Sequence, residues 1–464
     1  MNSILSIGGG RLHLVTSALH LAKADVNVRL VMGWVPQKSN GVLVRLASHV
    51  MHRNLEKSMR ARMMTGKVHN LSVCSQGIVD FIENAGRYAL SVVHAPFKIW
   101  DNWKWLSWKM IGFCSRRYIS KDYQIFHVRS GAGQGGAIKK ARQLGLKVIV
   151  DHSIAHPAFM DRELRNEYQK NGATFELGKD SKFWRQIVKD CEDADAVMVN
   201  SFFVRDTFLE QGFDEKKVKV VYLGQREDFF GLRQRRFDVS GLKFDVGEGS
   251  NSISKPQTSN LKPQTLIPSP QTSNLKLLFT GGFGFRKGGE YILEALKILK
   301  QRGVAFEMDV VGDYSSARQL IARYESDFDI SYASDLKPQT SNLRLTFHGP
   351  KPQDELKSFL ANGDIYVFPS LAEGCAQSGM EAMAAGMCVI GTHESGFPIT
   401  DGEDGYIVPC KAAKAIADKI EWLNGHREEI DRIGANAAKL IRENYTWEKY
   451  AENVKKIYEE LLKK

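Results

Sequence analysis

The chain has 464 residues, and with about 150 residues per domain as a guide it should form two or three domains. Hydrophobic residues make up 43% and charged residues 25%, a composition that excludes a disordered or collagen-like chain. Lysine and arginine outnumber aspartate and glutamate by 64 to 53, a net charge of +11 that suggests anionic partners: nucleic acid, phospholipid or a phosphorylated small molecule.

The first residues predict a buried strand followed by a glycine loop. No basic stretch precedes the apolar start, and Gly8, Gly9 and Gly10 follow it at once, which argues against a signal peptide. No uninterrupted apolar stretch approaches the ~20 residues that cross a bilayer. The six cysteines are widely spaced and form no CxxC pair. Together these features predict a cytoplasmic protein with reduced thiols, without a disulfide framework or a zinc site.

Two basic stretches lie in the N-terminal third. The stretch 45–67 has six lysines and arginines against Glu56 alone, and the stretch 98–121 interleaves four tryptophans with lysines and arginines. Tryptophan favours the headgroup region of a membrane, and the stems of lysine side chains reach past apolar surface. One hypothesis is therefore a peripheral contact with an anionic membrane surface. The alternative, which stays open, is a solvated basic face with the tryptophans in the core.

Apolar runs that alternate with amphipathic helical patterns continue through the first half. Such alternation is typical of parallel sheets of the doubly wound type. Buried strands are expected at 146–152, 194–201 and 218–224, with helices at 183–194 and 202–212.

A polar hexapeptide, PQTSNL, occurs at 256–261, 270–275 and 338–343. Its spacing is irregular and it has no apolar positions to stack, so it predicts inserted segments and not a solenoid. The copies divide the chain into an N-terminal Rossmann-like domain, a low-complexity linker, a C-terminal Rossmann-like domain with a repeat insertion, and a final helix that packs back on the N-terminal domain. The N-terminal domain is expected at 1–231 and the linker at 232–275. The C-terminal domain is expected at 276–440, with its insertion near 332–343, and the final helix at 441–464.

The second half repeats the alternation of strands and helices. Strands are expected at 275–282, 306–313, 343–349, 364–370 and 387–392, and helices at 289–303, 352–363 and 378–386. The fold class is therefore α/β, with two doubly wound domains facing each other across a cleft. In this architecture ligands bind at the carboxyl ends of the strands.

Two carboxylates follow the strand that ends near Ser370. Glu373 stands beside Gly374 in a loop, and Glu381 lies in a helix that begins near Ala376. Eight helical residues would separate the two by ~12 Å, which places both at the mouth of the cleft. The alternative is that they are acids near a helix start, favoured by the helix dipole.

A glycine-rich loop follows the first strand of the second half. Gly281, Gly282 and Gly284 let backbone N–H groups approach a phosphate, and Arg286 and Lys287 add two positive charges. The loop matches neither the dinucleotide fingerprint nor the P-loop, which argues against NAD enzymes and P-loop NTPases.

These two motifs resemble those of the retaining glycosyltransferases of family 4 (group 1 glycosyltransferases), which have the GT-B fold. That family has a Glu-x7-Glu motif, here Glu373 to Glu381, and a basic pair on the glycine-rich loop, here Arg286 and Lys287. The resemblance extends through 405–423 and 445–450 and, in the first half, 156–172, 194–213 and 217–230. It does not cover 35–125 or the PQTSNL insertions.

The resemblance implies transfer of a sugar from a nucleotide diphosphate sugar (a UDP-, GDP- or ADP-sugar) to an acceptor bound by the N-terminal domain. The two basic stretches suggest that this acceptor is a lipid-linked or membrane-proximal glycan. Glu381 would bind the ribose, Glu373 the hydroxyls of the transferred sugar, and Arg286 and Lys287 the departing diphosphate. His156 would lie near the donor sugar. The glycines that would approach the donor or the reaction centre are Gly281, Gly282, Gly374, Gly9 and Gly10. The resemblance implies no metal and no other cofactor, and no DxD-like motif stands out.

Several weaker features remain. His127, His152 and Arg129 also lie at strand ends on the cleft side, where structural roles are favoured over catalytic ones. Cys375, the pair at 387–388 and the pair at 225–226 depart from the family pattern, which bears on substrate identity. The alternatives are a nucleotide-sugar epimerase or a phosphorylase with the same fold, a basic nucleic-acid-binding protein, and an inactive sugar-sensing scaffold. Both glutamates and both basic residues favour the transferase, and the chain has no recognisable nucleic-acid reader module.

Overall fold

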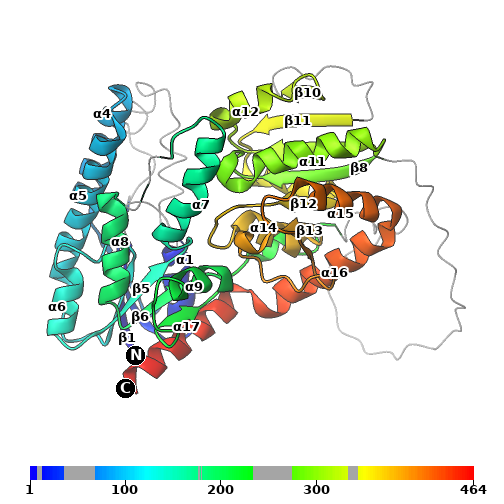
Figure 1. The fold of residues 1–464 in the computed structure, drawn as a ribbon. Helices are drawn as coiled ribbons and strands as arrows, with labels where there is room; N and C mark the ends of the chain where they lie inside the picture. The colour runs from blue at the N-terminus through cyan, green and yellow to red at the C-terminus, as the bar shows by residue number, and fades with distance from the viewer. Residues whose placement is uncertain are drawn as a thin grey trace, which may run out of the picture.

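A computed structural model describes residues 1–7, 13–35, 68–175, 178, 180–233, 274–332 and 343–463. Within these residues the chain forms two seven-stranded sheets, each with helices on both faces (Figure 1). The strand orders are β3-β2-β1-β4-β5-β6-β7 and β10-β11-β9-β8-β12-β13-β14, and the paired strands are parallel throughout. The predicted α/β fold class with two doubly wound domains is confirmed.

The N-terminal domain is built on strands that are almost entirely buried at its centre. Nearly every residue of β4 and β5 is buried, polar ones included, because helices cover both faces of the sheet. Its strands are β1 (Asn2–Ser6), β2 (Asn27–Met32), β3 (Leu71–Ser75), β4 (Ile125–Arg129), β5 (Lys147–His152), β6 (Ala196–Val199) and β7 (Val218–Val220). Its helices are α1 (Leu14–Lys23), α4 (Gly77–Val92), α5 (Phe97–Ser115), α6 (Ala137–Gln143), α7 (Pro157–Lys170), α8 (Lys182–Asp193) and α9 (Phe202–Leu209).

The C-terminal domain repeats this plan. Its strands are β8 (Leu275–Thr280), β9 (Phe306–Val311), β10 (Asp329–Tyr332), β11 (Leu343–Gly349), β12 (Ile365–Phe368), β13 (Cys388–Gly391) and β14 (Tyr406–Ile407). Its helices are α11 (Gly289–Gln301), α12 (Arg318–Ala322), α13 (Gln353–Asn362), α14 (Gln377–Ala385), α15 (Ala413–Gly425) and α16 (Arg427–Asn444). Strands β2, β3, β10 and β14 were not expected from the sequence; β3, β10 and β14 are edge strands that are only partly buried.

The chain crosses between the domains twice, and the two crossings lie side by side. The backbone N–H of Gln225 donates to the carbonyl of Tyr445 at 2.7 Å. A Cβ on Gly224 would come within 2.4 Å of the backbone nitrogen of Trp447, so a side chain there would push the crossings apart. After the second crossing, α17 (Trp447–Leu462) packs against α1, and Ser17 Oγ donates to Tyr450 Oη at 3.1 Å. The C-terminal helix is therefore part of the N-terminal domain's packing (Figure 1).

Several sequence-based predictions fall outside the described residues. They are the glycines Gly9 and Gly10, the basic stretch 45–67, nearly all of the linker 232–275, and the insertion near 332–343. None of the described helices has the length and apolar character needed to cross a membrane.

Deletion of residues 250–272 is expected to leave folding and activity intact. This segment is polar and repetitive, and insertions of that kind are tolerated where few contacts depend on them. The described residues before it are already anchored, because Arg233 Nη1 donates to the carbonyls of Asp364 and Gly386. Thermal unfolding and transfer assays of the shortened protein test this. A protein that fails to fold or loses all activity would show that the repeats are structural.

Candidate active site

Three of the residues predicted for the donor site meet at the carboxyl ends of β8 and β12. Arg286 Nη1 lies 2.6 Å from Glu373 Oε1, and Lys287 Nζ lies 3.6 Å from the same oxygen. Arg286 Nη1 also donates to the carbonyl of Ala372 at 3.0 Å. Two cations therefore share one carboxylate, which leaves the cluster with a net positive charge.

The backbone holds this cluster in place. Arg286 and Lys287 form a short 3-10 turn between β8 and α11. The carbonyl of Arg286 accepts hydrogen bonds from Leu371 N at 2.9 Å and Ser370 Oγ at 3.0 Å, which ties this turn to the loop after β12. The basic pair and Glu373 are 86 or more residues apart in sequence, and these bonds fix their distance.

Lys287 is the more deeply placed of the two cations. Its ammonium lies 5.1 Å from the centroid of the Phe368 ring, and its side chain is 19% exposed. Burial lowers the pKa of Lys287, while the carboxylate of Glu373 favours the charged form and raises it. Lys287 is partly desolvated, and it shares its counter-ion Glu373 with Arg286. A lysine in such a position attracts an anionic group strongly.

The predicted glycines Gly281, Gly282 and Gly374 surround this cluster for different reasons. Gly281 has φ +119°, and a Cβ there would come within 2.9 Å of Lys287 Nζ. A Cβ on Gly374 would come within 2.1 Å of the carbonyl oxygen of Ser153, so glycine lets the two domains touch. A Cβ on Gly282 would meet only Asp313 O at 3.8 Å. Packing within the described residues therefore does not explain Gly282, and its role toward a ligand stays a prediction.

The Glu373 loop is also where the N-terminal domain contacts the C-terminal domain. The N–H of Ala155 donates to the carbonyl of Glu373 at 3.1 Å, and Ser201 Oγ donates to the carbonyl of Gly374 at 2.6 Å. His156 follows Ala155 directly. The structure therefore brings His156 to the same part of the cleft as Glu373, although no contact between their side chains is present.

His156 is buried and has one ring nitrogen without a partner. Its Nδ1 accepts a hydrogen bond from the N–H of Ala158 at 3.1 Å, which caps α7. Its ring packs edge-on against Phe208, and burial lowers the pKa of His156 to about 4, so it is neutral at pH 7. Because Nδ1 accepts, the proton is on Nε2, and among the described residues that nitrogen has no hydrogen-bond partner. The expected role of His156 near the donor sugar stays a prediction.

Glu381 occupies a separate cavity of about 600 Å³ between the two crossings and α1. Its neighbours are polar or aromatic, and Gln225 Nε2 donates to Gln377 Oε1 at 2.8 Å. Residues that line the cavity with Glu381 include Thr16, His20, Gln225, Arg226, Asp228, Gln377 and Trp447. The sequence marked Gln225 and Arg226 only as departures from the family pattern, and the fold places them beside Glu381.

Burial raises the pKa of Glu381 to about 7, and Arg226 opposes this rise. The pKa of Glu381 in the folded state is higher than that of an exposed glutamate. The free energy of unfolding of the wild type therefore falls as pH rises from about 5 to 7, because the buried carboxyl must ionise. The variant Glu381→Gln is therefore expected to gain roughly 2 kcal/mol in the free energy of unfolding over the wild type between pH 5 and pH 8. Urea titrations of both proteins at the two pH values measure this. A difference that does not change with pH would show that Glu381 ionises normally.

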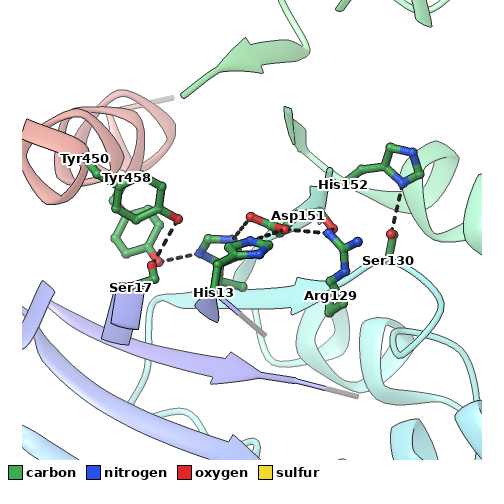
Figure 2. A network of polar contacts seen from close by, with 9 residues as sticks. His13, Ser17, Arg129, Ser130, Asp151, His152, Tyr450 and Tyr458 are labelled. Carbon is green, nitrogen blue, oxygen red and sulfur yellow. Dashed lines mark hydrogen bonds and ion pairs between the residues drawn. The ribbon is translucent and has the colours of Figure 1, made fainter. Parts of the chain in front are cut away.

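The weaker candidates lie in a buried polar region around Asp151: Arg129 pairs with Asp151 and His152 contacts Ser130 (Figure 2), and His127 Nε2 lies 3.9 Å from Asp151 Oδ2. His13 Nε2 and Arg129 Nη1 each lie 2.8 Å from Asp151 Oδ1. Burial alone would raise the pKa of Asp151, but His13, His127 and Arg129 hold it well below its ordinary value.

This network anchors the C-terminal helix under the cleft. His127 Nδ1 lies 2.8 Å from Tyr458 Oη, and His152 Nδ1 lies 3.0 Å from Ser130 Oγ. His127 and His152 are almost fully buried, and the structural roles favoured for them stay a prediction. The sequence did not single out Asp151 or Tyr458, and the only signal was that Asp151 comes near the end of an apolar run.

In the part of the chain that the structure describes, no group of three or more His, Cys, Asp or Glu side chains is placed to hold a metal ion. The expectation that the reaction uses no divalent cation stays a prediction.

The C-terminal domain is similar in sequence to known glycosyltransferases. Residues 267–440 match the family model described as "Glycosyl transferases group 1". The amylovoran biosynthesis glycosyltransferase AmsK of Erwinia amylovora is 31% identical over 178 residues, which cover 36% of this chain and 41% of AmsK. The capsular polysaccharide biosynthesis glycosyltransferase CapM of Staphylococcus aureus is 28% identical over 192 residues, covering 41% and 47%. The chain therefore matches less than half the length of these relatives.

Solved structures resemble the whole chain. Sucrose-phosphate synthase from Thermosynechococcus elongatus has a TM-score of 0.58 at 16% identity and covers 100% of this chain and 99% of its own. Anabaena Alr3699/HepE in complex with UDP has a TM-score of 0.56 at 12% identity, with 99% and 100% covered. At these identities the likeness concerns the fold alone. The C-terminal domain therefore carries the sequence pattern of the glycosyl transferases group 1 family, within a chain that has the GT-B fold.

Proposed function

We propose that this protein is a retaining glycosyltransferase of family 4 that moves a sugar from a nucleotide diphosphate sugar to a glycan acceptor. The observation that carries the proposal is the cluster of Arg286, Lys287 and Glu373 at the carboxyl ends of β8 and β12, where the Glu373 loop contacts the N-terminal domain. The relatives act in polysaccharide biosynthesis according to their names, which supports the same class of reaction.

The two cations would stabilise the diphosphate as it leaves. Negative charge grows on this group when the glycosidic bond breaks, and preorganised charges in a water-poor site lower the energy of that state. Lys287 is suited to this because burial has already removed much of its water. Helix α14 begins just after the Glu373 loop, so its N-terminal partial positive charge adds to the same field.

Glu373 would exchange partners when the donor binds. In the structure its carboxylate is the counter-ion of Arg286 and Lys287. A diphosphate carries more negative charge than one carboxylate and would replace it at the two cations. Glu373 would then turn to the hydroxyls of the transferred sugar, the role that the family resemblance implies.

Glu381 and His156 would hold other parts of the donor. The cavity beside Glu381 is large enough for a ribose, and its carboxylate can accept hydrogen bonds from both ribose hydroxyls. The Nε2–H of His156 is a donor without a partner among the described residues, suited to an oxygen of the sugar.

Donor and acceptor classes are proposed from the structural neighbours and the resemblance. Anabaena Alr3699/HepE was solved with UDP-glucose, and S. aureus TarM with Fondaparinux, alpha-GlcNAc-glycerol and UDP. For this chain we propose a UDP-, GDP- or ADP-sugar as donor and a lipid-linked or membrane-proximal glycan as acceptor, with the reaction in the cytoplasm and without a metal.

A thermal-shift screen of UDP-, GDP- and ADP-sugars, followed by donor hydrolysis assays, tests the proposal. A true donor present at 100 times its Kd should add ~2.7 kcal/mol to the free energy of unfolding. The anomeric configuration of the product, read by NMR, tests retention. Stabilisation by none of the nucleotide sugars, together with salt-sensitive binding to DNA, would instead favour the nucleic-acid-binding alternative.

A further inference from the structure

Helix α4 presents an apolar face to solvent. Ile78, Phe81, Tyr88 and Val92 are 78%, 74%, 68% and 59% exposed, and their spacing puts them on one side of the helix. A surface helix normally does the opposite, turning its apolar side to the core and its charges to water. An apolar face of this kind marks an interaction surface.

Two acidic residues of α4 lie on the side of the helix that faces the protein, opposite to the exposed apolar side. Asp80 and Glu83 are buried, and Asp80 Oδ2 accepts a hydrogen bond from the backbone N–H of Trp34 at 3.0 Å. The outward position of the apolar residues is therefore held by specific contacts on the inward side.

Helix α5 also exposes apolar residues. Ile99, Leu106 and Phe113 are spaced by seven residues and are 48%, 43% and 59% exposed. The two helices pack together, and Trp103 of α5 donates from Nε1 to the carbonyl of Glu83 in α4 at 3.3 Å. We call the exposed apolar residues of the two helices, with Ile82 and Val93, the α4–α5 face. It lies at the outer edge of the N-terminal domain, away from the C-terminal domain (Figure 1).

The exposed charges around this face are mostly positive, although Asp122 directly after Lys121 is an exposed acid. In residues 68–121 the three acidic residues, Asp80, Glu83 and Asp101, are buried. The seven basic residues are all exposed, namely Arg87, Lys98, Lys104, Lys109, Arg116, Arg117 and Lys121. A second copy of this chain would bring the same positive charges together, so charge disfavours a dimer through this face.

We propose that the α4–α5 face is a docking surface for an anionic lipid bilayer, on which the two helices lie flat. Apolar side chains would enter the boundary of the acyl chains while lysines and arginines bind anionic headgroups, the combination that characterises interfacial helices. This surface is separate from the cleft, so the inference goes beyond glycosyl transfer and does not depend on it.

The structure changes which residues would make the contact. The sequence pointed to the tryptophans of 98–121, but Trp103, Trp105 and Trp108 are only partly exposed, and Trp108 packs edge-on against Phe183. Phe81, Tyr88 and the aliphatic residues of α4 provide the most exposed apolar area instead.

Flotation of the full-length protein with vesicles tests the proposal. Vesicles of phosphatidylcholine with 30 mol% (about a third) phosphatidylglycerol should bind it, and vesicles of phosphatidylcholine alone should not, because each basic residue near an anionic surface strengthens binding about fivefold. The variant Ile78→Ser/Phe81→Ser/Tyr88→Ser should bind at least about tenfold more weakly. Its control is Ile407→Ser/Leu462→Ser, which changes exposed apolar residues on other elements and should bind like the wild type.

A charge-reversal pair completes the test. Lys98→Glu/Arg116→Glu/Arg117→Glu should bind at least about tenfold more weakly, while Lys216→Glu/Lys439→Glu/Lys456→Glu, equal in charge but elsewhere, should lose much less. Donor hydrolysis without vesicles should be unchanged in every variant, which separates this proposal from the proposed function. Equal binding to neutral and anionic vesicles, no binding to either, or dimerisation that Phe81→Ser abolishes would overturn it.

Discussion

Lys287→Ala is expected to lower the turnover number for sugar transfer by about 10²–10³ without unfolding the protein. Lys287 is the buried member of the basic pair, and its ammonium shares Glu373 with Arg286. Its loss removes one positive charge from the place where the diphosphate would gain negative charge. Steady-state kinetics with the donor found by the thermal-shift screen give the measurement.

Lys300→Ala is the matched control, because Lys300 is an exposed lysine at the far end of the helix that follows. It should transfer sugar at the wild-type rate. Glu381→Ala should also reduce transfer strongly, mainly through weaker donor binding, because its proposed partner is the ribose. Transfer within a factor of about two of wild type in both Lys287→Ala and Glu381→Ala would overturn the site assignment.

Glu373→Gln is expected to lower turnover by a similar factor of about 10²–10³ while UDP binds at least as tightly as it does to the wild type. The carboxylate of Glu373 competes with a diphosphate for Arg286 and Lys287, so its neutralisation leaves both cations open to the ligand. The same change removes an acceptor that would hold the sugar. Calorimetric titration with UDP and steady-state kinetics measure the two effects separately.

Arg286→Ala distinguishes this exchange of partners from general damage to the site. It removes a cation and leaves the carboxylate, so it should weaken UDP binding, opposite to the effect of Glu373→Gln. Without ligand, Glu373→Gln should unfold at a lower temperature than wild type, because two neighbouring cations lose their counter-ion. Weaker UDP binding in Glu373→Gln would show that the carboxylate does not compete with the diphosphate.

The pattern of apolar runs and helical periods determined the two-domain α/β fold. Runs such as 146–152 and 275–282 are buried on both faces of a parallel sheet, and such strands can be recognised in the sequence because their central positions are apolar. The edge strands β3, β10 and β14 were missed, since they bury fewer residues and lack that pattern.

The chemical identity of the cluster was also legible in the sequence. Arg286, Lys287 and Glu373 lie in loops that directly follow strands, and parallel strands bring their carboxyl ends to one edge. The distances between these three side chains could not be predicted from the sequence. They depend on hydrogen bonds such as that from Ser370 Oγ to the carbonyl of Arg286, which joins residues 84 positions apart.

Only the tertiary structure decided which side of each element meets solvent. It separated Glu381 from Glu373 by placing it in the cavity at the domain crossings, beside Gln225 and His20. It also turned the apolar side of α4 outward and buried Asp80 and Glu83. The spacing of apolar residues along a helix shows that one side is apolar, but whether that side faces a core or water depends on what the rest of the chain packs against it.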